Sequence, residues 1–139
     1  MGSSVIFLLI GVLILAVVLV LYISLTRRES PQLNRDKYQA QWLSIENSLS
    51  RDNEAASHMA VLNADKLLDQ ALRDRRYKGE KMADRMKSAK SVWHNENHVW
   101  AAHKLRNQLA HEASVQVSYD TVLRALSAYK QALKDLGAI

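Results

Sequence analysis

The sequence of 139 residues contains no cysteine, one proline and four glycines. Without cysteine, disulfide bonds and thiolate metal sites are excluded. The chain also lacks a glycine-rich phosphate loop and a Gly-x-Ser-x-Gly nucleophile elbow, so it carries no signature of these enzyme classes. Because glycine, proline and β-branched runs are scarce after residue 25, while alanine, leucine and charged residues are frequent, the sequence predicts an all-α protein.

Charge is absent from residues 5–25, which are mostly leucine, isoleucine and valine. A helix needs about 20 apolar residues to cross the hydrocarbon core of a bilayer, and it satisfies its backbone polar groups within one segment. This run of 21 residues is long enough to do so. We therefore predict a transmembrane anchor over residues 1–25, with the lipid bilayer as its partner.

A cleaved secretory signal is the alternative interpretation of this segment. Such a signal has a basic start, a shorter apolar core and a cleavage site between small residues. Residues 1–4 carry no basic side chain and residues 24–26 make a poor cleavage site, so we expect an uncleaved anchor. Four basic residues follow the span: Arg27, Arg28, Arg35 and Lys37. Because positive residues stay on the cytoplasmic side, we predict a single-pass protein of the cell inner membrane with its N-terminus outside.

All 19 basic and 14 acidic residues lie after the span. We predict a juxtamembrane linker over residues 26–32, which includes Pro31, and one cytoplasmic domain over residues 33–139, long enough to bury a core. The net charge of +5 fits attraction to an anionic leaflet or to nucleic acid. A solvated surface near a membrane is the alternative explanation of this charge.

Apolar periodicity and capping residues predict a four-helix antiparallel bundle with one additional short helix. The expected helices cover approximately residues 33–50, 52–76, 80–90, 96–111 and 118–137. The residues expected in the core recur at helical spacing: Tyr38, Trp42, Ile45 and Leu49, then Met59, Leu62, Leu68 and Leu72, and finally Val122, Leu126, Tyr129, Leu133 and Leu136.

The helix predicted over residues 96–111 has two different faces, because successive residues are about 100° apart. One face is apolar and carries Val99, Ala102, Leu105, Leu109 and Ala113. The opposite face carries Trp100, Lys104, Asn107 and His111, extended by Trp93 and Asn97 if the helix begins early enough. A tryptophan among polar residues indicates a second interface with a subunit or a ligand, at Trp100 and Lys104. The alternative is that Trp100 packs under the preceding loop.

The same helix ends with Arg106-Asn107-Gln108-Leu109-Ala110-His111. Arginine followed five residues later by histidine is common by chance, but here asparagine follows the arginine and one more long helix follows the motif. In these respects residues 33–137 resemble the HEPN superfamily of four-helix domains, whose ribonuclease members carry an Arg-Asn-x-x-x-His motif at this place.

A second resemblance covers three segments, residues 60–69, 77–80 and 100–112. Their sequences are Ala-Val-Leu-Asn-Ala-Asp-Lys-Leu-Leu-Asp, Tyr-Lys-Gly-Glu and Trp-Ala-Ala-His-Lys-Leu-Arg-Asn-Gln-Leu-Ala-His-Glu. Together they are similar to an uncharacterised family of small bacterial proteins, some of which also have an N-terminal membrane anchor. This resemblance supports the helical fold and implies no activity.

The HEPN resemblance implies metal-independent RNA cleavage, without a cofactor, by a homodimer whose two motifs line one cleft. His111 would transfer the proton, because histidine titrates near neutral pH, Arg106 would bind the phosphate and Asn107 would orient either group. Side chains five positions apart on a helix point about 140° apart, so the helix must end or bend at His111. The alternative is a structural Arg106, paired with Asp65 or Asp69.

Two further groups of residues each have a ligand-binding interpretation and a simpler structural one. His94 and His98 have the spacing of helical zinc ligands, but no acidic cluster accompanies them, so we predict surface histidines and no metal site. The basic residues of segment 73–81 suit RNA phosphates or lipid headgroups, and a solvated turn is the alternative.

Two functional predictions result from the sequence. The first is RNA binding or cleavage near the membrane through Arg106, Asn107 and His111. The second is a non-enzymatic dimerisation or protein-interaction module at the inner membrane, in which Trp100 and Lys104 meet a partner that the sequence does not identify.

Overall fold

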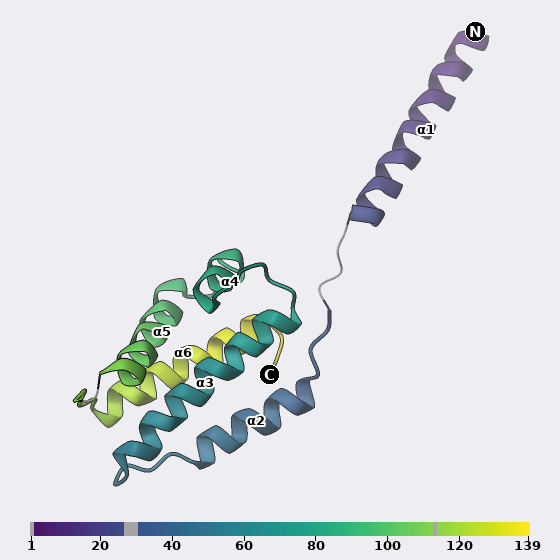
Figure 1. Cartoon of the computed structure of the whole chain (residues 1–139). Coiled ribbons are helices and arrows are strands. Elements are labelled where there is room, and N and C mark those ends of the chain that lie inside the picture. The colour runs from purple at the N-terminus through teal and green to yellow at the C-terminus, as the bar shows by residue number, and fades with distance from the viewer. Residues whose placement is uncertain (1, 27–30, 113) are drawn as a thin grey trace. The chain divides into compact units, whose positions relative to one another are not determined.

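The structure is a computed structural model that describes residues 2–26, 31–112 and 114–139. Within these ranges it contains six helices and no strand, which confirms the all-α prediction. The helices are α1 (Ser3–Thr26), α2 (Arg35–Asn47), α3 (Glu54–Asp74), α4 (Met82–Ser88), α5 (Glu96–His111) and α6 (Tyr119–Asp135). The chain divides into two compact units, Met1–Ser30 and Pro31–Ile139 (Figure 1).

The first unit consists of α1, which is long and apolar enough to cross a membrane. All of its residues are exposed, and it carries no charged side chain. Its polar side chains bond locally, since the hydroxyls of Ser24 and Thr26 donate to the carbonyl oxygens of Val20 and Tyr22, at 2.8 and 2.6 Å. A helix that is apolar on all sides requires apolar surroundings on all sides.

Side-chain caps explain where the long helices of the second unit begin. Asn34, Asn53, Asn95 and Ser118 precede α2, α3, α5 and α6, and each accepts a hydrogen bond from the backbone N–H three residues later. These bonds satisfy amides that have no partner inside the helix. The predicted bounds are correct for α5, and the other helices of this unit are shorter than predicted by up to three residues at an end.

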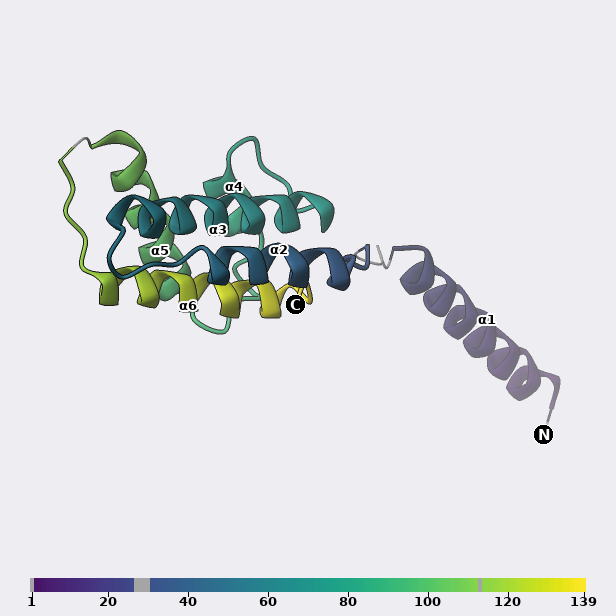
Figure 2. The same cartoon turned by 90° about the horizontal axis from the view of Figure 1, so that it is seen from below.

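The second unit is a helical bundle built around α3. This helix packs against α2, α5 and α6, and it also contacts the short α4. α3 and α6 run in the same direction, whereas α2 and α5 run the opposite way, as two perpendicular views show (Figures 1 and 2). The chain therefore reverses direction between consecutive long helices.

Most of the predicted core is buried. The buried members are Tyr38, Trp42, Ile45, Leu68, Leu72, Val122, Leu126, Tyr129, Leu133 and Leu136. The partly buried members are Leu49, Leu62, Leu105 and Leu109, and Val99 and Ala102 are buried on the apolar face of α5. Ala113 lies outside the described residues.

The prediction for Met59 is wrong, because its side chain is 54% exposed. The buried stripe of α3 passes instead through Ala60, Val61 and Ala64, all of them fully buried. Small side chains allow neighbouring helices to approach closely, so the alanines set which side of α3 faces the core. Met59 lies beside this stripe and points to solvent.

The connection between α3 and α4 turns at Gly79, whose φ is +153°. A Cβ atom at this position would lie 2.6 Å from the backbone nitrogen of Arg85 and 2.6 Å from Cβ of Asp84. Arg85 closes the turn by donating hydrogen bonds to the carbonyl oxygens of Gly79 and Glu80, at 2.8 and 3.1 Å. Both the backbone angle and the space therefore require glycine.

We expect Gly79→Ala to lower the free energy of unfolding by at least about 2 kcal/mol, because the strained angle and the displaced Arg85 backbone add together. Chemical denaturation of the full chain in detergent measures this change. Glu80→Ala is the matched control, since it changes an exposed neighbour in the same turn, and it should leave the midpoint unchanged. Equal midpoints for both variants would contradict this explanation of the turn.

Candidate functional site

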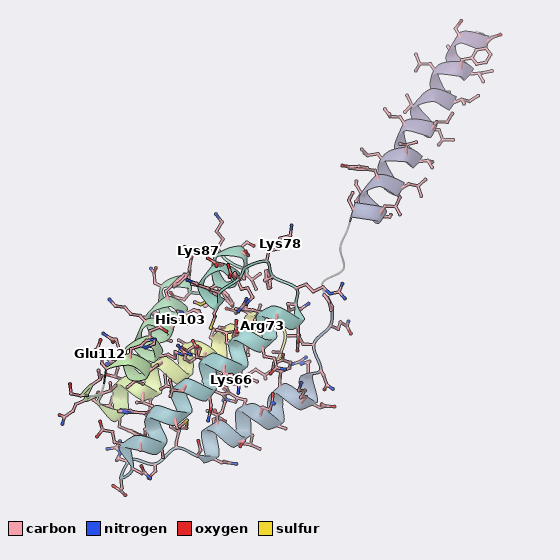
Figure 3. All side chains as sticks on the ribbon, viewed as in Figure 1. Lys66, Arg73, Lys78, Lys87, His103 and Glu112 are labelled. Carbon is pink, nitrogen blue, oxygen red and sulfur yellow. The ribbon has the colours of Figure 1, made fainter. Side chains whose placement is uncertain are left out.

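Asp65 lies on the apolar face of α3, and its side chain is only 4% exposed. Its Oδ1 atom lies 2.7 Å from Nδ1 of His103. The same oxygen accepts a hydrogen bond of 2.8 Å from the hydroxyl of Tyr129. His103 extends from α5 (Figure 3) and Tyr129 from α6, so the carboxylate of Asp65 on α3 joins three helices.

Arg106 provides the third contact of Asp65. Its Nε atom lies 3.1 Å from Oδ2 of Asp65 but is not aligned for a hydrogen bond, so the contact is an ion pair. Its Nη1 atom donates a hydrogen bond of 2.9 Å to Oδ1 of Asn107. The side chain of Arg106 is 35% exposed. The ion pair with Asp65 is the contact named above as the alternative to a catalytic Arg106.

His111 is the last residue of α5, and its side chain is exposed. The chain leaves the helical conformation at Glu112, where φ is −110° and ψ is 112°, as expected for a helix that ends at the motif. Five helical steps separate Arg106 and His111 by about 7.5 Å along the axis and about 140° around it. Within one chain, Arg106 therefore lies beside Asp65 and bonds to Asn107, whereas His111 points in another direction.

The polar face of α5 is only partly exposed. Trp100 is half-buried, its ring meets that of His103 edge-on at 6.1 Å, and its Nε1 donates to Oε1 of Glu96 at 3.3 Å. Lys104 is exposed. Trp93 does not extend this face, because α5 begins only at Glu96. Trp93 is instead 8% exposed and buried in the core.

A second charge network lies one turn further along α3. Oδ1 of Asp69 accepts hydrogen bonds from Nε and Nη2 of Arg85, at 2.8 and 2.6 Å. Oδ2 of Asp69 accepts a bond of 2.9 Å from Nε of Arg73. Arg85 is 5% exposed, so its charge is neutralised inside the protein. These contacts attach α4 to α3 and leave Asp69 with partners other than Arg106.

The sequence interpretation missed His103 and Tyr129 as partners of Asp65. An available signal was the position of Asp65 itself, four residues after Val61 and three before Leu68 on a stripe predicted to be apolar. A carboxylate on such a stripe is buried only when it is paired. The sequence does not show which residues pair with it, because they lie on other helices.

Two hollows adjoin α5. A mainly apolar groove of about 580 Å³ lies between α5 and α6 and is bordered by His94 and His98. The other, of about 630 Å³, is lined by two carboxylates, those of Glu54 and Glu112. His111 lines neither hollow. In the parts of the chain that the structure describes, no three acidic or histidine side chains gather as a metal site requires.

Comparisons of the chain with models of protein families, with curated proteins and with solved structures gave no match.

We expect Asp65→Ala to cost about 3–5 kcal/mol of stability, because it leaves buried donors of His103 and Tyr129 and the charge of Arg106 without their acceptor. Thermal unfolding of the full chain in detergent measures the loss. Asp52→Ala removes an exposed carboxylate and is the matched control, with an expected change below about 0.5 kcal/mol. A loss below about 1 kcal/mol for Asp65→Ala would show that the network is not needed for folding.

We expect the stability to fall as the pH rises above the ordinary tyrosine pKa of about 10. Burial, followed by the adjacent Asp65 carboxylate, raises the pKa of Tyr129 far above that value. Tyr129 then keeps its proton in the folded state while the unfolded chain loses it, so unfolding is favoured by up to about 1.4 kcal/mol per pH unit. Below pH 10 the tyrosine keeps its proton in both states, so Tyr129 makes its full contribution to the free energy of unfolding.

Tyr129→Phe tests the assignment of this pH dependence. The variant should show a shallower decline of unfolding free energy between pH 10 and 12 than the wild type. Removal of the hydroxyl also lowers the free energy of unfolding by an amount that does not depend on pH. This amount is measured separately at neutral pH. Parallel declines in the two proteins would exclude Tyr129 as the titrating group.

Proposed function

We propose that this protein is a membrane-tethered, non-enzymatic interaction module whose helical domain pairs with a second copy of itself. In this proposal α1 crosses the inner membrane with its N-terminus outside, and residues 31–139 form a HEPN-like bundle in the cytoplasm. The length and apolar composition of α1 and the basic residues that follow it support the anchor and its orientation.

The environment of Arg106 is the observation that carries this proposal. A catalytic arginine directs its guanidinium group at the phosphate, whereas the Nε of Arg106 faces Asp65 and its Nη1 bonds to Asn107. Turning Arg106 toward a substrate would remove the cation from a buried carboxylate, which is costly. We therefore assign Arg106 to holding α5 against α3.

The polar face of α5 is the proposed pairing surface, with Trp100 near its N-terminal end and Lys104 one turn further along. Tryptophan is enriched at the energetic centres of protein interfaces because its large ring buries much area. Glu96 and His103 already fix the ring of Trp100. A side chain that is fixed before binding loses little conformational entropy when a partner covers it.

RNA cleavage is the second candidate, and the exposure of His111 at the end of α5 favours it. A histidine in this position is accessible to a phosphodiester, and a second copy would supply the opposing groups. However, the exposed Glu112 directly follows His111, and its negative charge repels phosphate. The geometry therefore gives more support to the interaction module.

The mass of the full-length chain in detergent, measured by light scattering, tests the pairing surface. We expect a dimer for the wild type and at least a tenfold weaker dimer for Trp100→Ala, equal to about 1.4 kcal/mol. Leu123→Ala is the matched control, because Leu123 is 40% exposed on α6 and its truncation removes apolar surface elsewhere. A monomeric wild type would contradict the proposal.

The same samples are then incubated with RNA in EDTA, which separates the two candidates. The interaction module predicts that the RNA remains intact with the wild type. RNA cleavage by the wild type that disappears in His111→Ala would replace our proposal with the ribonuclease. Because His111 is exposed, this substitution removes the imidazole without disturbing the core.

A further inference from the structure

The positive charge of the chain is concentrated in one segment. Residues 73–90 contain eight basic and three acidic side chains, an excess that equals the whole net charge of +5. The rest of the sequence is balanced, with eleven residues of each sign. An even distribution would be expected of a surface whose charges serve only solubility.

Five of these basic residues make up what we call the basic end: Arg76, Lys78, Lys81, Lys87 and Lys90. All five are exposed, and none forms an ion pair with any residue that the structure describes. The side chains of Lys78 and Lys87 point away from the bundle at the corner formed by α4 (Figure 3). Two carboxylates, those of Glu80 and Asp84, are exposed among them, so the surface keeps an excess of positive charge.

The basic end is supported by internal contacts that keep its shape. Ser88 donates a hydrogen bond of 2.6 Å to the carbonyl oxygen of Lys78, which ties α4 to the preceding turn. Arg85, held by Asp69, bonds to the carbonyl oxygens of that turn. The lysines are therefore presented by a folded corner, and they lose little backbone entropy when they bind.

The chain enters the domain next to this segment. Nη1 of Arg75 donates a hydrogen bond of 3.3 Å to the carbonyl oxygen of Pro31, the first residue of the second unit. Only residues 27–30 separate Pro31 from the end of α1 at Thr26. Whatever the orientation of the two units, the backbone limits the distance between Thr26 and Pro31 to about 18 Å.

We propose that the basic end docks on anionic lipid headgroups of the bilayer that holds α1. This inference rests on the membrane anchor of the proposed function and adds a lipid-binding surface to it. The tether makes docking an intramolecular step with a high effective concentration, so weak individual contacts are sufficient. Each basic side chain near an anionic leaflet strengthens the attachment by about fivefold.

The shape of the basic end favours lipid over RNA. Single-stranded RNA is bound in basic grooves with aromatic platforms on which bases stack. The only aromatic residue of segment 73–90 is Tyr77, which is half-buried and packed against the core. Neither of the two hollows described above is lined by a residue of the basic end. A set of exposed lysines and an arginine outside both hollows instead matches a flat layer of phosphate groups.

The test uses the full-length chain in vesicles of phosphatidylcholine, with or without phosphatidylglycerol. Because the chain has no cysteine, Ser91→Cys places a single fluorophore beside Lys90. Ser114→Cys places it beyond the end of α5, for comparison. We expect headgroup-linked quenchers to quench the label at position 91 more strongly when phosphatidylglycerol is present. High salt should reverse the effect, because it shortens the screening length from about 10 Å at 0.1 M to about 3 Å at 1 M.

The triple variant Lys78→Gln, Lys87→Gln and Lys90→Gln should weaken docking about hundredfold, since three charges contribute about fivefold each. The matched control Arg51→Gln, Lys66→Gln and Arg124→Gln neutralises three exposed cations elsewhere and should dock like the wild type. Equal weakening by both triple variants would show an effect of net charge alone and would overturn the assignment of the surface.

Two outcomes separate this inference from the function on which it rests. If alkaline carbonate removes the chain from phosphatidylcholine vesicles, the chain has no membrane anchor. This outcome overturns both the proposed function and the docking of the basic end. If the chain resists extraction but quenching of the label at position 91 does not depend on phosphatidylglycerol, only the docking proposal is overturned. Binding of RNA that only the Lys78, Lys87 and Lys90 variant loses, with no response to lipid, would assign the basic end to RNA.

Discussion

The buried carboxylate of Asp65 is the constraint on which the arrangement of the long helices depends. Desolvation of an ion costs several kcal/mol, so a buried carboxylate is tolerated only where donors and cations replace its water. Asp65 obtains these from His103 and Arg106 on α5 and from Tyr129 on α6. Both contacts with α5 require the side of that helix that carries His103 and Arg106 to face α3.

The same constraint determines what the Arg-Asn-x-x-x-His segment does within one chain. Arg106 and Asn107 are neighbours, so both remain near Asp65 when α5 is fixed on α3. His111, more than one turn further along, is carried to the exposed end of the helix. Residue types that suit phosphate chemistry are thus divided between the interior and the surface. Spacing in the sequence does not reveal this division, because it depends on how α5 is rotated.

The parts of the fold that were predictable depend on local signals. Capping side chains and apolar periodicity act within a few residues, and they located α5 from Glu96 to His111 correctly. The partners of Asp65 were not predictable in this way, since His103 and Tyr129 are 38 and 64 positions away. The core position predicted for Met59 was wrong, because its side chain is exposed. The phase of α3 is set by close contacts of its alanines with neighbouring helices, which helical periodicity alone does not describe.

The distribution of charge follows from these internal networks. Asp65 pairs with Arg106 of α5, and Asp69 pairs with the buried Arg85 of α4 and with the exposed Arg73 of its own helix. The excess of positive charge is left on the surface around the α3–α4 turn. The guanidinium of Arg75 binds the carbonyl oxygens of Pro31 and Leu136, which gathers the start and the end of the domain beside α3. Segment 73–90 therefore carries the net charge and also binds Pro31, where the chain enters the domain. Because the backbone limits the distance between Thr26 and Pro31 to about 18 Å, the entry of the chain cannot move far from any membrane that holds α1.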